Sequence, residues 1–148
     1  SVMPTNLYGL NDTYDKNNSH VIPSLILKIH DAKINNKKSV KIWGDGSAKR
    51  EFLFAEDAAE AILFIIKNYS NIEPINIGSG EEVTINKLVK LICKVINYKG
   101  EIIYDKTKPN GTPRKRLDLT KLNKLGWNSK INLKKGLKIV YNNFKIND

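Results

Sequence analysis

One histidine, His20, is the side chain in this sequence best suited to acid–base chemistry. It precedes Pro23 at the start of an expected helix and lies outside that helix's apolar stripe, so its imidazole could face a cleft. Imidazole is neutral near pH 7 and readily protonated, which suits a group that shuttles a proton. A solvent-facing or helix-capping role is the alternative from local sequence. The other histidine, His30, is interpreted as structural or exposed.

Cationic side chains on stiff loops form a second group with chemical potential. Arg50 follows a glycine turn, and the Arg-Lys-Arg run at 114–116 follows a loop with two prolines. A guanidinium can bind two phosphate oxygens at once, so these loops suit a diphosphate. Trp43, just before the same glycine turn, could stack on a base or a sugar, and packing in the core is the alternative.

Other patterns that could carry chemistry do not fit their context. The glycine pairs at 44–46 and 78–80 complete neither G-x-G-x-x-G nor the Walker pattern, so both are interpreted as tight turns. The spacing Tyr-x-x-x-Lys, which can place a phenol beside an ammonium, occurs at Tyr104/Lys108 and Tyr141/Lys145. Tyr104 ends an expected strand and Tyr141 belongs to an apolar helix face. These 148 residues therefore contain no dinucleotide fingerprint and no reductase pair.

Composition places the chain among ordinary globular proteins. It has 148 residues, 41% apolar and 27% charged, which fits one domain with a hydrophobic core. No uncharged run approaches the roughly 18 residues that cross a bilayer, and the start lacks a signal-peptide pattern, so we expect no membrane partner and no leader. The single cysteine, Cys93, excludes an internal disulfide and a multi-cysteine metal site. We expect no metal and a cytoplasmic, reducing compartment.

The net charge of +10 points to a polyanionic partner. Residues 106–138 contain eleven Lys or Arg against one acidic residue. A nucleic-acid-binding module is the alternative from another class, but there is no recognition-helix or RNA-binding motif, and aromatics do not interleave with the basic run. We therefore expect no nucleic-acid partner. A purely structural partner domain is a further alternative.

Helices are expected where apolar residues recur with a period near 3.6. Pro23 is tolerated in the first turn of the first helix, whose apolar stripe extends to Ile29. Asp57 and Glu60 are spaced as in a capping box, and Thr84 is an expected N-cap. The later helices should span 55–69, 84–96, 120–125 (closed by a glycine) and 133–144.

Short extended runs predict strands at 2–7, 40–43, 50–54, 74–77 and 101–104, with a polar loop at 8–18 and a basic loop at 105–116. A hairpin-like excursion is expected at 40–54, around the glycine turn. Alternating short strands and helices predict an α/β fold. Since no βαβ unit leads the chain, we expect this layer to pack against another part of a longer protein, with a core that is incomplete by itself.

Local motifs identify a family. They are PTNLYG at 4–9, NSHVIP at 18–23, WGxG at 43–46 with REFL at 50–53, NIGxG at 76–80 and KPxGTPRK at 108–115. Over essentially the whole chain they resemble the GDP-L-fucose synthase family, within the extended short-chain dehydrogenase/reductases. The first and third types recur across sugar-nucleotide epimerases. NSHVIP and KPxGTPRK are more particular to this family.

The resemblance implies that residues 1–148 are the sugar-nucleotide-binding C-terminal portion of a Rossmann-type enzyme. Residues 1–10 would be a remnant of the cofactor-binding domain, whose N-terminal Rossmann half is expected to precede this chain. The implied reaction converts GDP-4-keto-6-deoxy-mannose to GDP-L-fucose by 3,5-epimerisation and then 4-keto reduction, with NADPH (NADP) as cofactor. The implied partners are the GDP-sugar, the Rossmann half and a second subunit in a homodimer. The chain alone is expected to be inactive.

The same resemblance implies roles for particular residues. Those at the nicotinamide end of NADPH are Pro4, Thr5, Asn6 and Leu7, together with His20, which also acts as the acid in epimerisation. The substrate-binding set is Lys28, Trp43, Arg50, Asn110 and Lys115.

Two of the substrate-binding residues depart from the common pattern. Lys28 stands where Arg is frequent, and Asn110 stands where Asp is usual. Because of these two departures, the resemblance does not fix which GDP-sugar is bound. The alternative is therefore a C4-reductase or epimerase that acts on a related GDP-6-deoxy-4-keto sugar, such as a heptose.

Overall fold

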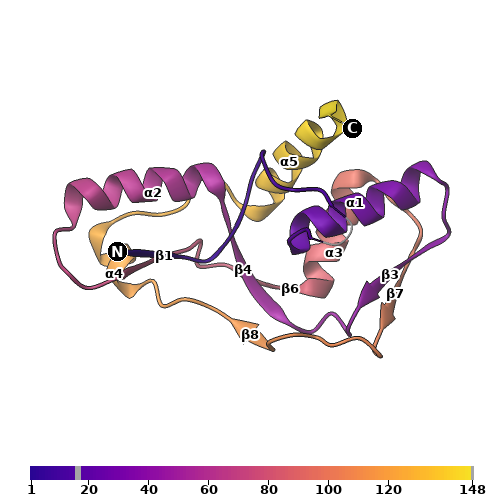
Figure 1. Ribbon diagram of the computed structural model, residues 1–148, viewed down its shortest axis with the longest axis horizontal. Helices are drawn as coiled ribbons and strands as arrows, with labels where there is room; N and C mark the ends of the chain where they lie inside the picture. Colours follow the sequence, from indigo (N-terminus) through magenta and orange to yellow (C-terminus); the bar gives the residue numbers. More distant parts are fainter. Residues whose placement is uncertain (16–17, 148) are drawn as a thin grey trace.

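The computed structural model describes residues 1–15 and 18–147, with the side chains of 147 left aside; 16–17, in the predicted polar loop, lie outside the described residues. Short strands alternate with helices, so the α/β fold is confirmed (Figure 1). In chain order the elements are β1 (Val2–Pro4), β2 (Asn6–Tyr8), α1 (Val21–Ile34), β3 (Ser39–Trp43), β4 (Lys49–Phe54), α2 (Ala55–Asn68), β5 (Ile75–Ile77), β6 (Glu82–Thr84), α3 (Ile85–Ile96), β7 (Glu101–Asp105), β8 (Arg114–Lys115), α4 (Thr120–Leu125) and α5 (Leu133–Asn147).

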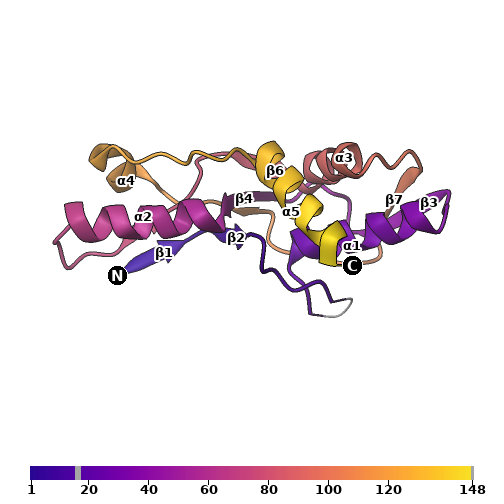
Figure 2. The ribbon, with the colours of Figure 1, turned by 90° about the horizontal axis from the view of Figure 1, so that it is seen from above.

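The elements gather at two ends of an elongated molecule, joined by β4 (Figures 1 and 2). The end that carries the N-terminus holds α2, α4, β1 and β5, and the other end holds α1, α3, β3 and β7. Each end has its own buried cluster. The larger one includes residues of α1, α3 and α5. The smaller one consists of Leu53, Ala58, Ala61, Ile65, Ile75, Ile77, Leu122 and Trp127.

Strand pairing is mostly parallel and between distant segments. β1 pairs with β5, β2 with β4, β3 with β7 and β8 with β4, all parallel, whereas β4 and β6 are antiparallel. Parallel neighbours need a crossover, so each of these pairs joins segments far apart in the sequence. β4 is the strand with most partners among the described residues, and it therefore organises the sheet.

The predicted hairpin between 40–43 and 50–54 is wrong, because β3 and β4 take different partners. Gly44 and Gly46 both have φ near +76°, which favours glycine, and they turn the chain away between the two strands. The start of α3 then holds this excursion, since the N–H of Asn86 donates to the Gly46 carbonyl oxygen (2.9 Å). The excursion thus packs on a helix.

Helix ends follow the sequence in part. The Thr84 cap is confirmed, since its hydroxyl oxygen accepts the N–H of Lys87 (3.1 Å). Gly126 ends α4 with φ 90°, also as predicted. The capping box is wrong, because α2 begins at Ala55 after Phe54, without a side-chain cap.

Asp57, predicted to cap α2, instead faces inward and is buried. Its Oδ2 accepts the N–H groups of Lys130 (3.0 Å) and Ile131 (2.8 Å), just before α5. Asp57 therefore accepts hydrogen bonds from backbone N–H groups distant in the sequence, and not from those in the first turn of α2.

Strands differ from the prediction where they are short. The single run expected at 2–7 is two strands, because at Thr5 the chain leaves β1 and its N–H donates to the Ile77 carbonyl oxygen (2.9 Å). β6 and β8 were not predicted. Their three and two residues are too few, and too polar, to show a period of two.

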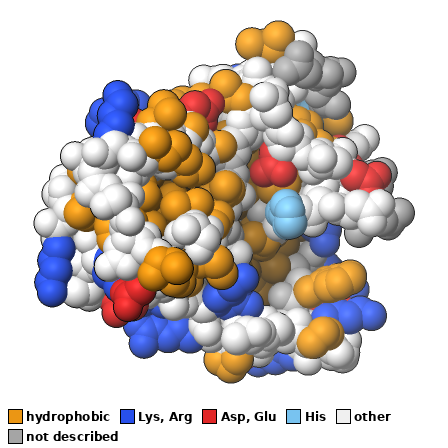
Figure 3. All heavy atoms as spheres, turned by 60° about the vertical axis from the view of Figure 1, so that its left-hand side comes forward, with side chains coloured by type: hydrophobic (Ala, Val, Ile, Leu, Met, Phe, Trp, Pro, Cys, Tyr) orange, Lys and Arg blue, Asp and Glu red, His pale blue; other side chains and the backbone are white. Residues whose placement is uncertain are grey.

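Apolar side chains are exposed at the N-terminal end. On α2, Leu63 is 61% and Ile66 71% exposed, and Met3 on β1 is also exposed. Figure 3 views this end and shows hydrophobic side chains gathered over it. Among the described residues β1 pairs with β5 alone, which leaves its other edge open. These features agree with the expectation of an incomplete core.

Candidate functional site

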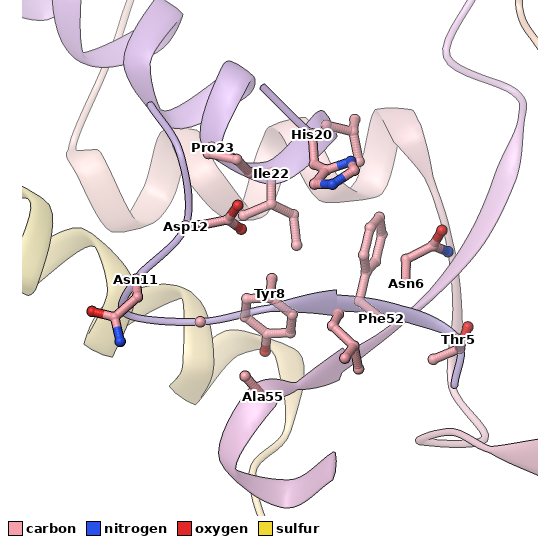
Figure 4. A pocket seen from close by; sticks show the side chains of 13 residues that line it. Thr5, Asn6, Tyr8, Asn11, Asp12, His20, Ile22, Pro23, Phe52 and Ala55 are labelled. Carbon is pink, nitrogen blue, oxygen red and sulfur yellow. The ribbon is translucent and has the colours of Figure 1, made fainter. Parts of the chain in front are cut away.

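A cavity of about 510 Å³ lies between β2, the loop that follows it and the first turn of α1 (Figure 4). Thr5, Asn6 and Leu7 line it together with His20. The structure therefore brings together four of the five residues expected at the nicotinamide end of the cofactor. Pro4 is not among the lining residues and pairs with Ile77 in the sheet.

Side-chain hydrogen bonds to a backbone carbonyl hold β2 and the residue before it against β4. Asn6 Nδ2 donates to the carbonyl oxygen of Glu51 (2.8 Å), and the Thr5 hydroxyl reaches the same oxygen (3.3 Å). β2 then continues in parallel register with residues 52–54. One wall of the cavity is consequently built on the central strand.

His20 stands at the N-cap position of α1 in an extended conformation, and its side chain makes no capping hydrogen bond. The Ser19 hydroxyl fixes the preceding loop, since it donates to the Thr13 carbonyl oxygen (2.7 Å) and accepts the N–H of Asp15 (2.5 Å). The imidazole is exposed at the cavity. The capping alternative is therefore wrong, whereas the exposure of the ring agrees with the solvent-facing alternative as well as with a ring that faces the cavity.

Sequence reasoning missed Tyr8, Asp12 and Phe52 in the cavity wall. Figure 4 shows the His20 ring on the Phe52 side and Asp12 on the side of Asn11. Burial is the main cause that raises the pKa of Tyr8 far above its usual range, and the negative charge of Asp57 adds to it. The phenol therefore stays protonated at neutral pH. Phe52 could have been found, because it lies two residues after Arg50 on the same strand.

Arg50 and Lys115 form a pair of cations next to the cavity. They are opposite each other in the parallel register of β4 and β8, so their side chains share one face of the sheet. Strand alternation puts Phe52 on that face as well. Arg50 Nη1 donates to the Thr112 carbonyl oxygen (2.6 Å), and the resulting cationic face suits a diphosphate.

The remaining substrate-binding candidates surround the end of β3. Trp43 is 64% exposed, so packing in the core is wrong for it, and Lys108 Nζ lies 5.8 Å from its ring centre. Lys28 Nζ, on α1, donates to the carbonyl oxygen of Lys41 (3.3 Å), which lies on β3 with Trp43. An exposed indole with cations nearby can stack on a base or a sugar.

Asn110 holds the turn that follows Trp43. Its Oδ1 accepts the N–H of Asp45 (2.7 Å). A Cβ on Gly44 would lie 2.2 Å from this oxygen, so the close approach requires glycine. The side-chain oxygen is therefore directed to the turn.

The five substrate-binding candidates do not line the cavity of His20. They form two neighbouring groups, one at β4 and β8 and the other around β3. Strand β4 connects the first group to the cavity through the shared face of Arg50 and Phe52.

The other side chains that could carry chemistry lie in packed surroundings. Burial raises the pKa of Tyr104 in β7 and of Cys93 in α3, which opposes ionisation of either. Tyr141 is buried in the larger cluster, and its hydroxyl lies 3.0 Å from His30 Nδ1, which gives His30 a structural contact. Within residues 1–15 and 18–147, no group of three or more His, Cys, Asp or Glu is placed to hold a metal ion. No helix of this part is long and apolar enough to cross a membrane.

Comparison with known proteins gives consistent relatives. A GDP-L-fucose synthase of Sinorhizobium fredii is 48% identical over 147 residues, which cover 99% of this chain and 47% of that protein. A GDP-L-fucose synthetase from Naegleria fowleri, solved bound to NADP, superposes with a TM-score of 0.92 at 28% identity over 99% of this chain and 46% of that one. MlghC, a GDP-mannoheptose C4 reductase from Campylobacter jejuni with NADP bound, gives 0.86 and 28% over 97% and 52%.

The chain spans about half the length of the curated relatives it matches. The sequence profile described as the NAD dependent epimerase/dehydratase family matches residues 1–78, and these residues include β1, β2, β4 and the cavity wall they build. Because the match covers more than half of these 148 residues, the chain belongs to the NAD dependent epimerase/dehydratase family.

Proposed function

We propose that this chain is the substrate-binding part of an NADPH-dependent GDP-L-fucose synthase, which converts GDP-4-keto-6-deoxy-mannose to GDP-L-fucose. The observation that carries the proposal is the placement of His20 in one cavity with Thr5, Asn6 and Leu7, beside the strand that bears Arg50. The similarity to relatives named GDP-L-fucose synthase supports the choice of reaction.

The chemistry assigned to His20 follows from the 4-keto group of this substrate. That group makes the protons at C3 and C5 acidic, so a base removes each one and an acid returns it on the opposite face. An imidazole that is exposed at the cavity and free of a capping bond suits the acid. When bound, NADPH supplies the hydride that reduces C4.

The cavity wall fits the nicotinamide end of that cofactor. Leu7 offers an apolar contact, and the Asn6 amide, anchored by Nδ2 on the Glu51 carbonyl, keeps its oxygen for a donor. Thr5 is buried at the bend between β1 and β2 and fixes the wall.

The substrate would extend from this cavity along the face of β4. Arg50 and Lys115 are assigned to the diphosphate, because two adjacent cations match its charge. Trp43 is assigned to the sugar or ribose, with Lys28 and Asn110 beside it.

A C4-reductase acting on a related GDP-6-deoxy-4-keto sugar is the second candidate. The structural likeness to the Campylobacter jejuni reductase supports it, and the residues at 28 and 110, which depart from the common pattern, leave the identity of the sugar open. Product analysis by NMR in deuterated water separates the two candidates, because only an enzyme that epimerises the sugar puts deuterium at C3 and C5.

The proposed partners are an N-terminal Rossmann half and a second subunit in a homodimer, and the proposed compartment is the cytoplasm. The exposed Leu63 and Ile66 of α2 support a further domain, because apolar side chains gathered on one face are normally covered, and the open edge of β1 is free to pair with a further strand. The glycine-rich fingerprint, which residues 1–148 lack, would belong to that half.

The experiment is a calorimetric titration of the chain with GDP. We expect Arg50→Met to weaken GDP binding at least tenfold, whereas Lys49→Met, the same loss of charge on the other face of β4, changes it less than about twofold. Equal losses in the two variants would contradict the assigned site. An absence of GDP binding even with a Rossmann half restored would favour a structural partner domain, and tighter, salt-sensitive binding to DNA would favour the nucleic-acid alternative.

A further inference from the structure

Glu51 is a charged side chain that the proposed reaction leaves without a role. It lies in β4 between Arg50 and Phe52 and is 0% exposed. Its Oε1 accepts the N–H of Gly80 (2.8 Å), and Oε2 lies 3.5 Å from the N–H nitrogen of Leu117.

Burial of a carboxylate costs free energy unless hydrogen bonds to its oxygens offset the loss of water. An apolar side chain would fill the same space at lower cost in desolvation. None of the ion pairs found among the described residues includes Glu51, so backbone N–H groups compensate its charge. These donors belong to two loops that the carboxylate ties to the central strand.

The glycine turn at 78–80 is shaped around this carboxylate. A Cβ on Gly78 would lie 2.3 Å from Oε1 of Glu51, which is closer than real Cβ contacts, and 3.0 Å from its Cδ. Gly78 itself is buried, so the side chain of Glu51 has little room to move away. The turn therefore requires glycine at this position because the carboxylate approaches it.

The second loop carries a cation of the proposed diphosphate site. Leu117 follows β8, in which Lys115 stands opposite Arg50. At the other end of the same segment, Arg50 Nη1 donates to the Thr112 carbonyl oxygen (2.6 Å). Adjacent residues of β4 thus hold both ends of the segment 112–117.

The backbone of Glu51 makes a third connection. Its carbonyl oxygen accepts the side chains of Asn6 (2.8 Å) and Thr5 (3.3 Å), which line the cavity of His20. One residue therefore connects the wall of that cavity, the glycine turn and the cationic segment.

We propose that Glu51 is a positioning residue that fixes Lys115 opposite Arg50 and so presets the diphosphate site. It acts through the N–H groups of the two loops and does not touch the nucleotide. This inference rests on the proposed binding of a GDP-sugar.

The test compares Glu51→Gln with the wild-type chain in calorimetric titrations with GDP. Glutamine keeps the shape but replaces one acceptor by a donor, so one loop loses its hydrogen bond. We expect Kd for GDP to rise about tenfold, with faster hydrogen exchange at the Lys115 and Leu117 amides. Gly78→Ala, which displaces the carboxylate without changing any charge, should reproduce both effects.

Asp57→Asn is the matched control. Asp57 is also buried and accepts two backbone N–H groups, but these belong to Lys130 and Ile131, away from the cationic segment. We expect this variant to bind GDP as the wild type does, at a temperature where circular dichroism shows every variant folded.

Three outcomes would overturn the inference. They are wild-type GDP affinity in folded Glu51→Gln, unchanged exchange at Lys115 and Leu117, or an equal loss of affinity in Asp57→Asn. A wild-type chain that binds no GDP would contradict the proposed function instead, and the exchange at Lys115 and Leu117 in the absence of ligand would still decide whether Glu51 holds the segment.

Discussion

At the scale of single residues, polar side chains differ in whether hydrogen bonds to the backbone hold them. His20 makes no capping bond and faces the cavity, whereas Glu51 and Asp57 are buried and accept backbone N–H groups. The first is available for chemistry, and the other two fix the backbone. Substitutions should therefore separate catalysis from stability.

His20→Asn tests the catalytic assignment in an extended chain that adds a dinucleotide-binding half before residue 1. We expect deuterium incorporation at C3 and C5 of the GDP-sugar to slow by about 10²- to 10⁴-fold, the usual contribution of a general acid. GDP affinity should stay within about twofold, because the imidazole is not assigned to the diphosphate. Proton NMR follows the exchange, and an unchanged rate would remove His20 from the mechanism.

Asp57→Ala tests the buried link between α2 and the loop before α5. Two partly buried N–H groups, of Lys130 and Ile131, would lose their acceptor, so the free energy of unfolding should fall by about 1–3 kcal/mol. Urea denaturation measures this. Glu60→Gln, which breaks the surface pair with Lys130 Nζ (2.6 Å), should cost at most about 1 kcal/mol. A comparable loss in both variants would contradict this interpretation of Asp57.

At the scale of elements, the short strand β8 is held by a side-chain pair as well as by β4. Arg114 donates from Nε (2.8 Å) and Nη2 (2.6 Å) to the two carboxylate oxygens of Glu82 in β6. These hydrogen bonds lower the pKa of Glu82, while its partial desolvation opposes the shift. Because β8 bears Lys115, this pair also supports the cationic face.

Arg114→Gln should return the pKa of Glu82 towards its ordinary value, near 4.3. The folded-state pKa is the lower one, so the pair contributes stability above the unfolded pKa and loses it as the pH falls through the folded pKa. The pH dependence of stability below about pH 4 should therefore weaken in the variant. A carboxyl-carbon NMR titration of Glu82 measures the shift, and an identical titration in the variant would contradict the role of Arg114.

Gly126→Ala tests the end of α4. No atom lies within 4 Å of an added Cβ, so the whole cost comes from the backbone at φ 90°. We expect a loss of about 1 kcal/mol in unfolding free energy, and a smaller one for Gly126→Asn, because asparagine tolerates this conformation better. Thermal unfolding compares the two variants. Equal stability of alanine and glycine at 126 would mean that α4 does not depend on this turn.

Local signals in the sequence identify helices better than strand partners. The Thr84 cap and the glycine after α4 act within a few residues, so both could be predicted. The hairpin and the capping box were wrong because β3 and Asp57 take partners some 60 to 75 residues away. The family motifs point to His20 and the cations, but only the fold shows that Phe52 and Arg50 share a face. A buried carboxylate such as Glu51 leaves no periodic signal.

At the scale of the whole molecule, the two ends differ in completeness. The larger cluster packs three helices around its core. The end with the N-terminus leaves Leu63 and Ile66 exposed and one edge of β1 open. The chain also matches only about half the length of each curated relative.

The most direct test of the proposed function is NMR analysis in deuterated water of the product formed from GDP-4-keto-6-deoxy-mannose and NADPH. With a dinucleotide-binding half added before residue 1, we predict NADPH oxidation and a GDP-L-fucose product that carries deuterium at C3 and C5; residues 1–148 alone should oxidise no NADPH. NADPH oxidation without deuterium at C3 and C5 would contradict the epimerase assignment, and turnover by the 148 residues alone would contradict the division of function between the two halves.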